Sequence, residues 1–304
     1  MKLGMIGLGR MGGNMTTRLL RKGHEVVALD RSADAVAQAE ANGAIGAHSL
    51  EELVQKLTER PRVLWVMVPA GDPTSQTIRQ LSDLCEPGDM VIDGGNTNWK
   101  AALDDAAVLK ERAIHYLDSG TSGGIWGLAN GYCLMVGGPR EAYEYCTPIF
   151  KALAPDEGGL VHTGPEGSGH FVKMVHNGIE YALMQAYAEG FHIMKSSHAF
   201  PGMDMHEIAE AWRFGSVVRS WLLDLIADGL SKDSELAGLR GYVEDTGEGR
   251  WTVQAAVEDA VPSPTITMAL YERFRSRLED TFADKMLAMM RNQFGGHAVR
   301  TTVP

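Results

Sequence analysis

KLGMIGLGRMG, residues 2–12, and EVVALD, residues 25–30, decide the fold of the N-terminal part of the chain. The first stretch is a short apolar run followed directly by the glycine pattern GLGRMG, and residues 15–22 then have helical spacing. The second stretch reads as a buried strand that ends in an acidic residue. A strand, a GxGxxG turn, a helix, a second strand and a carboxylate within about 30 residues are typical of a dinucleotide-binding βαβ unit.

The three glycines of this pattern have separate expected tasks. The first allows a tight turn, the second lets the backbone approach a pyrophosphate, and the third lets the helix pack closely on the strand. The N-terminus of the helix offers free N–H groups to the anion. A purely structural turn is the alternative interpretation. We expect the cofactor loop to comprise Gly7, Leu8, Gly9, Arg10, Met11 and Gly12.

The carboxylate at the end of the second strand predicts which cofactor binds. Asp30 can accept hydrogen bonds from the adenosine ribose hydroxyls and would repel a 2′-phosphate, which favours NAD over NADP. Arg31 indicates the opposite, because an arginine at this place could pair with that phosphate. It could equally stack on the adenine or remain in solvent. NAD is therefore the expected cofactor and NADP the less favoured one.

Composition is ordinary for a globular protein and excludes several functional classes. The 304 residues suffice for two domains of about 150 each, with 44% hydrophobic and 22% charged residues. The net charge of -11 argues against nucleic-acid or membrane-surface binding, because phosphate groups recruit Lys and Arg. No run approaches the ~20 apolar residues of a membrane span. The three cysteines lack metal-ligand spacing, so we expect reduced thiols, no metal and a cytoplasmic location.

Strand and helix signals alternate as far as residue 163. Strands that end in small, polar or glycine-rich loops are predicted at residues 62–68, 90–92, 115–117, 132–136 and 159–161. Ligands bind at the carboxyl ends of such strands. We therefore expect Val68, Pro69 and Ala70 to border the cofactor, and Asn96 and Ser122 to reach a ligand. The last two residues are also common turn formers, and residues 119–124 read as a loop.

Strand signals stop in the second half of the chain. We predict an α/β Rossmann-type dinucleotide-binding domain, residues 1–163, followed by an all-α domain, residues 164–304. Helical spacing predicts helices at residues 182–197, 205–213, 217–227, 235–243, 252–257 and 266–290. The glycines within residues 245–252 predict a loop there.

A polar helix face opens this second half. Residues 164–181 read GPEGSGHFVKMVHNGIEY. At about 100° per residue, Lys173, His176, Asn177 and Glu180 fall on one face of a helix. A solvated face is the usual interpretation of such a set. Apolar residues flank it, however, and Lys and Glu are seldom fully buried without partners. We therefore interpret this face as one wall of a functional cleft.

Seven motifs in order resemble 6-phosphogluconate dehydrogenase over nearly the whole chain: GLGRMGGN, MVPAG, DGGN, SGG, KMVHNGIEY, GRWT and FGGH. The similarity is greatest to the short, NAD-preferring branch of that family. KMVHNGIEY is the most specific motif. The broader β-hydroxyacid dehydrogenase superfamily shares the dinucleotide domain, the SGG loop and a lysine with an asparagine four residues later. His176 and Glu180 favour 6-phosphogluconate dehydrogenase over the other members of that superfamily.

The resemblance implies an activity and a role for each matching residue. The implied reaction is oxidative decarboxylation of 6-phosphogluconate to ribulose 5-phosphate and carbon dioxide, with reduction of NAD. Lys173 would take the proton from the substrate 3-hydroxyl, and Glu180 would protonate the enediol. Burial or a nearby cation would favour a neutral lysine at such a site. The residues implied to hold substrate hydroxyls and carboxylate are His176, Asn177, Asn96, Ser122, Gly123 and Gly124.

The resemblance also implies a phosphate site and an assembly. Tyr181 and Arg273 would bind the phosphate or the sugar near it. Arg291 and His297 would do so from a neighbouring subunit, which implies a homodimer or a higher homo-oligomer. The helical domain would then serve substrate binding and oligomerisation.

Two departures from the family pattern leave alternatives open. Ile125 and Trp126 follow the SGG motif where the longer enzymes have an acidic pair, and Glu248 stands where a phosphate contact is expected. The alternative activity is NAD-dependent oxidation of a small or unphosphorylated β-hydroxy acid, such as a 3-hydroxyisobutyrate-like acid or gluconate. A non-catalytic dinucleotide sensor is a third reading.

Overall fold

The computed structural model of the chain describes residues 1–300, which divide into two compact units after Asn177. The boundary expected after residue 163 stays a prediction. The longest helix, α8 (Ser168–Lys195), begins in the first unit and continues into the second.

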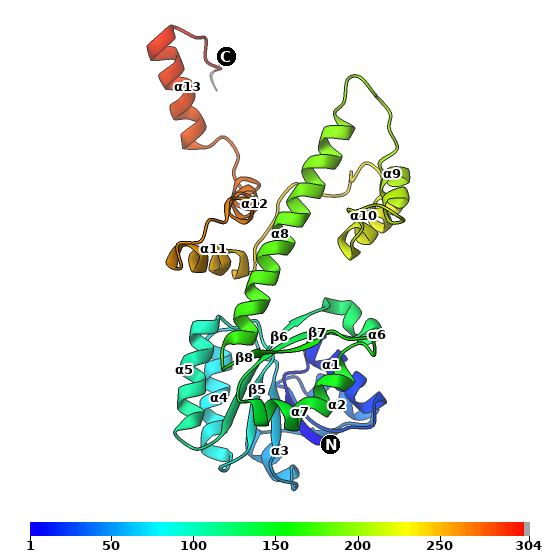
Figure 1. Ribbon diagram of the computed structural model, residues 1–304, viewed down its shortest axis with the longest axis vertical. Helices are drawn as coiled ribbons and strands as arrows, with labels where there is room; N and C mark the ends of the chain where they lie inside the picture. The colour runs from blue at the N-terminus through cyan, green and yellow to red at the C-terminus, as the bar shows by residue number, and fades with distance from the viewer. Residues whose placement is uncertain (301–304) are drawn as a thin grey trace. The chain divides into compact units, whose positions relative to one another are not determined.

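One sheet of eight strands forms the centre of the first unit (Figure 1). The strands are β1 (Lys2–Ile6), β2 (Glu25–Leu29), β3 (Ile45–Ala47), β4 (Val63–Val66), β5 (Met90–Asp93), β6 (His115–Ser122), β7 (Cys133–Gly137) and β8 (Leu160–Gly164). Their order across the sheet is β3-β2-β1-β4-β5-β6-β7-β8. Only β6 and β7 pair in antiparallel fashion. The first six strands follow the usual Rossmann order.

This strand order creates a binding edge. β1 pairs with β2 on one side and with β4 on the other, so the chain reverses its direction of travel across the sheet at β1. Ligands of open α/β sheets bind at the carboxyl ends of the strands beside such a reversal. Asp30 follows β2, the segment containing Asn96 follows β5, and Ser122 ends β6. The expected functional residues of the first unit therefore follow neighbouring strand ends.

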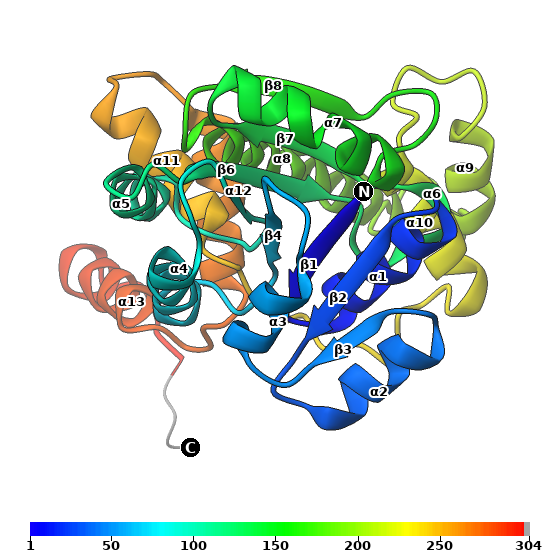
Figure 2. The same cartoon turned by 90° about the horizontal axis from the view of Figure 1, so that it is seen from below.

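Helices bury both faces of the sheet. The apolar core on one face includes residues of α1 (Arg10–Arg21), α2 (Ala33–Ala41) and α7 (Arg140–Leu153). The core on the other face includes residues of α3 (Leu50–Lys56), α4 (Asp72–Leu84) and α5 (Trp99–Lys110), as Figure 2 shows. Strand side chains alternate between the two layers: Met5 packs in the first and Ile6 in the second. Two short helices, η1 (Gly124–Trp126) and α6 (Gly127–Asn130), follow β6.

The described residues of the second unit form helices and connecting loops, without strands. After α8 come α9 (Met205–Trp212), α10 (Trp221–Lys232), α11 (Glu248–Glu258), α12 (Pro264–Arg275) and α13 (Phe282–Gly295). One apolar cluster joins α8 to α9 and α10, and a second joins α8 to α11 and α12. The expected fold class, a Rossmann-type domain followed by an all-helical one, is confirmed.

Local expectations failed at four places. Residues 235–243 form no helix, and Leu236 there has a positive φ of 51°. The helix predicted over residues 266–290 is two helices, because Thr281 accepts a hydrogen bond from the Asp284 N–H and starts α13 afresh. Residues 119–122 extend β6 because they pair with β7. Most of the loop predicted over residues 245–252 belongs to α11.

Candidate active site

The glycine loop after β1 has the geometry that its sequence predicts. Gly7 has φ 97°, and a Cβ placed on it would lie 2.5 Å from the Met67 carbonyl oxygen. A Cβ on Gly12 would lie 2.0 Å from the Gly7 carbonyl oxygen, so helix and turn approach too closely for any side chain. Gly9, which precedes the first residue of α1, has no atom within 4 Å of such a Cβ. The structure therefore accounts for the turn at Gly7 and for the close packing of the helix at Gly12.

Asp30 holds this loop in place. Its Oδ2 accepts a hydrogen bond of 2.6 Å from the Leu8 N–H, and its Oδ1 accepts one of 2.8 Å from the Ser32 N–H. Hydrogen bonds to a carboxylate are stronger than those between neutral groups. The carboxylate thus ties the end of β2 to the glycine loop, and it is half-buried at the binding edge.

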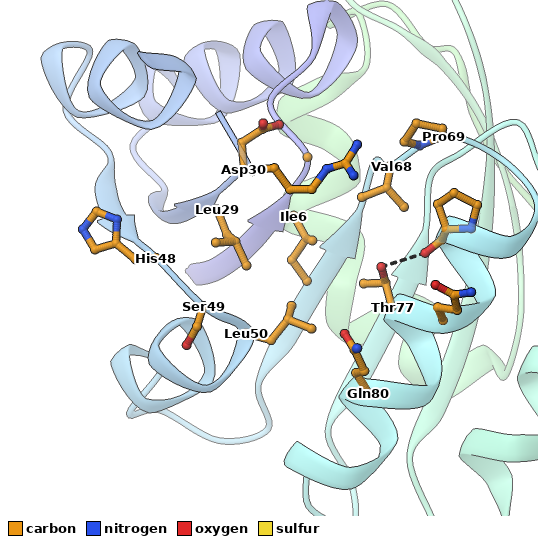
Figure 3. Close-up of a pocket in the computed structure, with 14 residues that line it drawn as sticks. Ile6, Leu29, Asp30, His48, Ser49, Leu50, Val68, Pro69, Thr77 and Gln80 are labelled. Carbon is orange, nitrogen blue, oxygen red and sulfur yellow. Dashed lines mark hydrogen bonds between the residues drawn. The ribbon is translucent and has the colours of Figure 1, made fainter. Parts of the chain in front are cut away.

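A cavity of about 370 Å³ opens beside this carboxylate (Figure 3). Asp30 and Arg31 line it from the end of β2, and Val68 and Pro69 line it from the segment after β4. Gly7 borders it from the glycine loop. The cavity contains five of the residues expected to bind the cofactor. Leu8, Gly9, Arg10, Met11 and Gly12 form the adjoining loop and the start of α1, and Ala70 does not line the cavity.

Sequence reasoning missed much of the cavity wall. The remaining residues come mainly from the start of α3 and from α4: Ile6, Leu29, His48, Ser49, Leu50, Pro73, Gln76, Thr77 and Gln80. A sequence signal existed for α4, since Gln76, Thr77 and Gln80 recur at helical spacing on one side. No local pattern indicates that this side faces the end of β2.

A second group of polar residues gathers where β5 and β6 end and α8 begins. The Lys173 Nζ donates a hydrogen bond of 2.8 Å to Asn96 Oδ1. The two residues are separated by 77 positions in the chain. The side chain of Lys173 is half-buried. The structure thus brings together the expected base and one expected substrate ligand.

His176 connects this group to the SGG motif. Its Nε2 lies 3.5 Å from Ser122 Oγ, and its Nδ1 lies 3.0 Å from Asn177 Oδ1. When Nδ1 carries the proton it donates to the amide oxygen, and Nε2 then accepts from the serine hydroxyl. Gly123 and Gly124, with φ 132° and 52°, turn the chain immediately after Ser122. Five predicted site residues of the first unit thus lie at the ends of β5 and β6 and in the first turns of α8: Asn96, Ser122, Lys173, His176 and Asn177.

Asp118 caps the start of α8. Its two carboxylate oxygens accept hydrogen bonds of 2.7 Å from the N–H groups of Gly167 and His170. These N–H groups have no partner within the helix, and a negative charge at a helix N-terminus is favourable. Burial raises the pKa of Asp118, although His170 and the two N–H groups oppose that shift.

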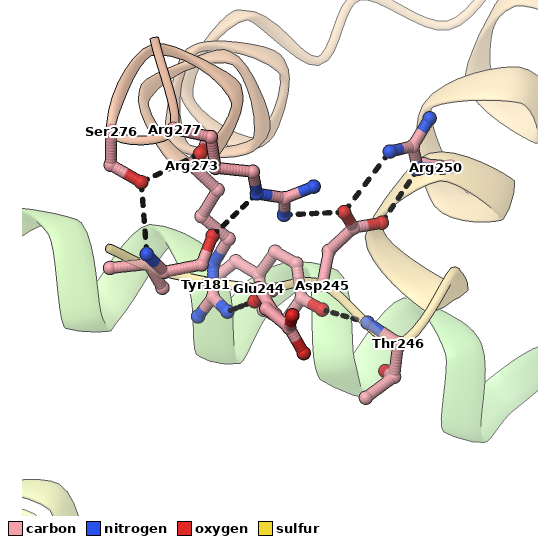
Figure 4. A network of polar contacts seen from close by, with 9 residues as sticks. Tyr181, Glu244, Asp245, Thr246, Arg250, Arg273, Ser276 and Arg277 are labelled. Atoms are coloured by element: carbon pink, nitrogen blue, oxygen red, sulfur yellow. Dashed lines mark hydrogen bonds and ion pairs between the residues drawn. The ribbon is translucent and has the colours of Figure 1, made fainter. Parts of the chain in front are cut away.

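Within the second unit, Tyr181 and Arg273 belong to one polar network (Figure 4). The Arg273 guanidinium stacks 3.5 Å from the centre of the Tyr181 ring and donates 2.8 Å to the Glu244 carbonyl oxygen. The Tyr181 hydroxyl accepts a hydrogen bond from the Thr246 N–H. Asp245 pairs with Arg250 and Arg277, at 2.6 Å each. Its hydrogen bond with Arg250, and then that with Arg277, hold the pKa of this carboxyl well below its usual range, although burial opposes the shift.

Glu248 stands at the start of α11 and is only 2% exposed, so its carboxylate is buried there. Arg291 belongs to α13 and His297 follows that helix, and both are exposed. Glu180 lies in α8, two turns after Lys173.

Residues 1–300 contain neither a candidate metal-ligand cluster nor a helix that could span a membrane. No group of three or more His, Cys, Asp or Glu side chains is arranged to hold a metal ion in this part of the chain, and the expectation of no metal stays a prediction. None of the described helices combines the length and apolar character needed to cross a membrane.

The chain matches two family models that together cover almost all of it. Residues 2–164 match the NAD binding domain of 6-phosphogluconate dehydrogenase. Residues 169–301 match the 6-phosphogluconate dehydrogenase C-terminal domain.

Three known proteins are similar to the chain. The NAD(+)-dependent, decarboxylating 6-phosphogluconate dehydrogenase of Haloferax volcanii is 45% identical over 300 residues, covering 98% of both chains. The NADP(+)-dependent enzyme of Bacillus subtilis is 36% identical over 292 residues, 92% of this chain and 62% of that longer protein. The solved structure of Plasmodium falciparum 6-phosphogluconate dehydrogenase, studied in apo form and with NADP+ or 6-phosphogluconate, matches with a TM-score of 0.84 at 28% identity. That match covers 100% of this chain and 67% of the other.

Proposed function

The chain belongs to the 6-phosphogluconate dehydrogenase family, and on that premise we propose that it oxidises and decarboxylates 6-phosphogluconate with NAD. The products are ribulose 5-phosphate and carbon dioxide. The observation that carries the proposal is the 2.8 Å contact of Lys173 with Asn96 at the carboxyl edge of a dinucleotide-binding sheet. Because both family models are those of 6-phosphogluconate dehydrogenase, a small or unphosphorylated β-hydroxy acid has less support as the substrate.

The residues of the first unit fit a nicotinamide dinucleotide. The glycine loop is open at Gly9, the helix behind it offers N–H groups, and the cavity beside Asp30 suits an adenosine. NAD, when bound, supplies the acceptor for the hydride that leaves C3 of the substrate. Asp30 and Arg31 would hold the adenosine end, with Val68 and Pro69 as the opposite wall.

Lys173 is the proposed base for the 3-hydroxyl proton. A neutral amine keeps two N–H donors and one lone pair, so it can donate to Asn96 and still accept that proton. Oxidation at C3 gives a β-keto acid, whose carbonyl accepts the electron pair released when carbon dioxide leaves. The lysine, now an ammonium, donates to that carbonyl oxygen and stabilises the negative charge that develops there. Glu180 then returns a proton to the enediol carbon.

The proposed substrate ligands form two sets. Asn96, Ser122, Gly123, Gly124, His176 and Asn177 are the proposed ligands of the hydroxyls and the carboxylate. Tyr181 and Arg273 are the proposed phosphate site, and their stacking keeps the guanidinium in a fixed orientation.

The proposed assembly is a homodimer or a higher homo-oligomer in which Arg291 and His297 complete a neighbouring site. The helical unit supports this, because it exposes several large apolar side chains that a contact between subunits would cover. These include Ile193, Phe214, Val217 and Phe294, which are 71%, 72%, 99% and 96% exposed. We propose a cytoplasmic location from the three free thiols.

A substrate and cofactor screen tests the activity. Purified protein given 6-phosphogluconate and NAD should form NADH, carbon dioxide and ribulose 5-phosphate in equal amounts, measured by absorbance and by chromatography of the sugar phosphate. Gluconate and 3-hydroxyisobutyrate are the matched substrates without the phosphate or the sugar chain. Oxidation of either of these without turnover of 6-phosphogluconate would establish the alternative activity instead.

Asp30→Asn should reduce the preference for NAD over NADP about tenfold, measured as the ratio of the two kcat/KM values. The amide can no longer accept two charge-assisted hydrogen bonds from a ribose, and a bond to a charged group is worth about 1.5–3 kcal/mol. It also no longer repels a 2′-phosphate. Asp34→Asn, an exposed change of the same charge in the first turn of α2, is the control and should leave the ratio unchanged. An equal ratio in wild type and Asp30→Asn would count against the carboxylate.

A further inference from the structure

Asp93 is a fully buried carboxylate beneath the Asn96 loop, and the proposed reaction gives it no role. It ends β5 and is 0% exposed. Its Oδ1 accepts a hydrogen bond of 2.9 Å from the Gly95 N–H, which bends the chain just before Asn96. Its Oδ2 accepts one of 3.2 Å from the Tyr116 hydroxyl. The carboxylate therefore fixes the turn that presents Asn96 to Lys173.

His170 brings an imidazole to the same carboxylate from α8. Its Nε2 lies 3.3 Å from Asp93 Oδ2, a charge contact whose alignment falls short of a hydrogen bond. The side chain is 2% exposed, and its backbone N–H is the one that Asp118 caps. His170 also stands three residues before Lys173, so the two side chains are neighbours on the helix surface. The contact joins the first turn of α8 to the end of β5.

The charges of this cluster favour an ionised pair. Burial opposes the imidazolium, but Asp93 and then Asp118 outweigh it and raise the pKa of His170 above 6.5, while Lys173 acts against them. Burial likewise opposes the Asp93 carboxylate, but His170 outweighs it and lowers the pKa of Asp93 below 3.8. Both shifts therefore act in the direction that favours the charged forms. Tyr116 faces the same carboxylate, and burial raises its pKa well above the ordinary value, so it stays neutral.

These two pKa shifts determine how the contribution of the pair to folding stability changes with pH. The His170 contribution to folding stability is full below pH 6.5 and is lost as the pH rises through the raised pKa. The Asp93 contribution is full above pH 3.8 and is lost as the pH falls through the lowered pKa. The pair thus contributes fully to the stability of the start of α8 between pH 3.8 and pH 6.5 and weakens on the alkaline side.

We propose that Asp93 and His170 form a buried ion pair that positions Lys173 against Asn96, which makes His170 a positioning residue for the proton transfer. The pair and the Lys173–Asn96 hydrogen bond are two parallel links between the same two segments, the turn after β5 and the first turns of α8. Asp118 holds the helix backbone from β6. The inference rests on the proposed function of Lys173.

His170→Gln should lower kcat for 6-phosphogluconate oxidation about 10–100-fold, because a displacement of about 1 Å at a reacting group can cost 10² in rate. KM for NAD should stay within about twofold, since His170 does not line the cavity beside Asp30. The acid limb of the kcat/KM profile should move to higher pH, because the variant leaves Asp93 unpaired and favours the protonated form of the neighbouring base. A purely structural role would lower the amount of folded protein and leave the acid limb in place.

Three further variants complete the test. His162→Gln removes a half-buried histidine that contacts the Gly138 carbonyl oxygen, and it should keep wild-type kcat and pH profile. Asp93→Asn should reproduce the kcat loss. The double variant Asp93→Asn/His170→Gln, a neutral pair of similar shape, serves if either single variant unfolds. It has no unpaired carboxylate, so its kcat should fall while its acid limb stays at the wild-type pH.

Nitrogen NMR of the histidine side chains measures the protonation of His170 and does not depend on enzyme activity. In wild type, one histidine should titrate above pH 6.5, and its signal should be absent in His170→Gln and titrate at lower pH in Asp93→Asn. If wild type does not oxidise 6-phosphogluconate, the proposed function fails while this spectrum still reports the ion pair. A His170 that titrates below pH 6.5, or a His170→Gln enzyme with kcat within twofold of wild type and an unmoved acid limb, would overturn the inference.

Discussion

Lys173→Met should lower kcat for 6-phosphogluconate oxidation by about 10³-fold while NAD binding stays within twofold of wild type. A positioned base contributes about 10²–10⁴-fold to a rate, and methionine keeps the length of the side chain without a proton acceptor. The substitution also leaves Asn96 Oδ1 without the 2.8 Å hydrogen bond that it accepts in the wild-type chain. NADH formation under saturating substrate measures the rate, and calorimetric titration measures NAD binding.

Lys195→Met is the matched control for that experiment. It makes the same substitution in the same helix, at an exposed lysine that pairs with Glu235 at 2.6 Å. Surface ion pairs of this kind contribute about 0–1 kcal/mol to stability, so activity should stay within twofold. A Lys173→Met enzyme that keeps more than a tenth of the wild-type kcat would show that another group takes the hydroxyl proton.

Gly169→Ala should destabilise the first unit by about 1–3 kcal/mol or more and reduce kcat at least tenfold. A Cβ at this position would lie 2.4 Å from the Met135 carbonyl oxygen, 2.5 Å from that of Asp118 and 2.8 Å from the Gly137 nitrogen. All three are backbone atoms of the sheet and cannot rotate away. The expected cost of overpacking is about 1–3 kcal/mol, which exceeds the gain of up to about 1 kcal/mol from placing alanine in a helix.

The loss of activity should follow from the same displacement. The first turn of α8 must move away from β6 and β7, and Lys173 moves with it. Urea unfolding followed by tryptophan fluorescence gives the stability, and NADH formation gives kcat. Gly190→Ala is the control in the same helix, because no atom lies within 4 Å of its added Cβ, and it should be neutral or stabilising by up to about 1 kcal/mol. Equal stability of Gly169→Ala and wild type would contradict the close packing at this position.

Elements with strong local signals were predicted well. The buried strand, the glycine turn and the acidic residue at the end of β2 follow one another in the sequence, so a short stretch contains the whole pattern. By contrast, residues 235–243 have helical spacing but contain Gly238 and Gly241, and spacing alone cannot outweigh the entropy of glycine.

The errors at strand ends have a different cause. Residues 119–122 contain small and polar side chains that favour a turn, yet they extend β6 by pairing with β7. Such pairing depends on a partner strand that lies later in the chain, and strand propensity depends strongly on that context. A single sequence pattern therefore underestimates the length of a strand whose partner stabilises it.

The sequence by itself determined the class of this protein: a Rossmann-type domain, a helical domain, a nicotinamide cofactor and the helix with Lys173, His176 and Glu180. These features depend on periodicity, on turn chemistry and on motifs whose residues are neighbours in the chain. Only the tertiary structure decided that α4 lines the cavity beside Asp30, that Asn96 accepts a hydrogen bond from Lys173, and that Asp93 lies beside His170. The physical reason is that hydrogen bonds and charge contacts between distant segments depend on how the helices pack on the sheet, and that packing leaves no local pattern in the chain.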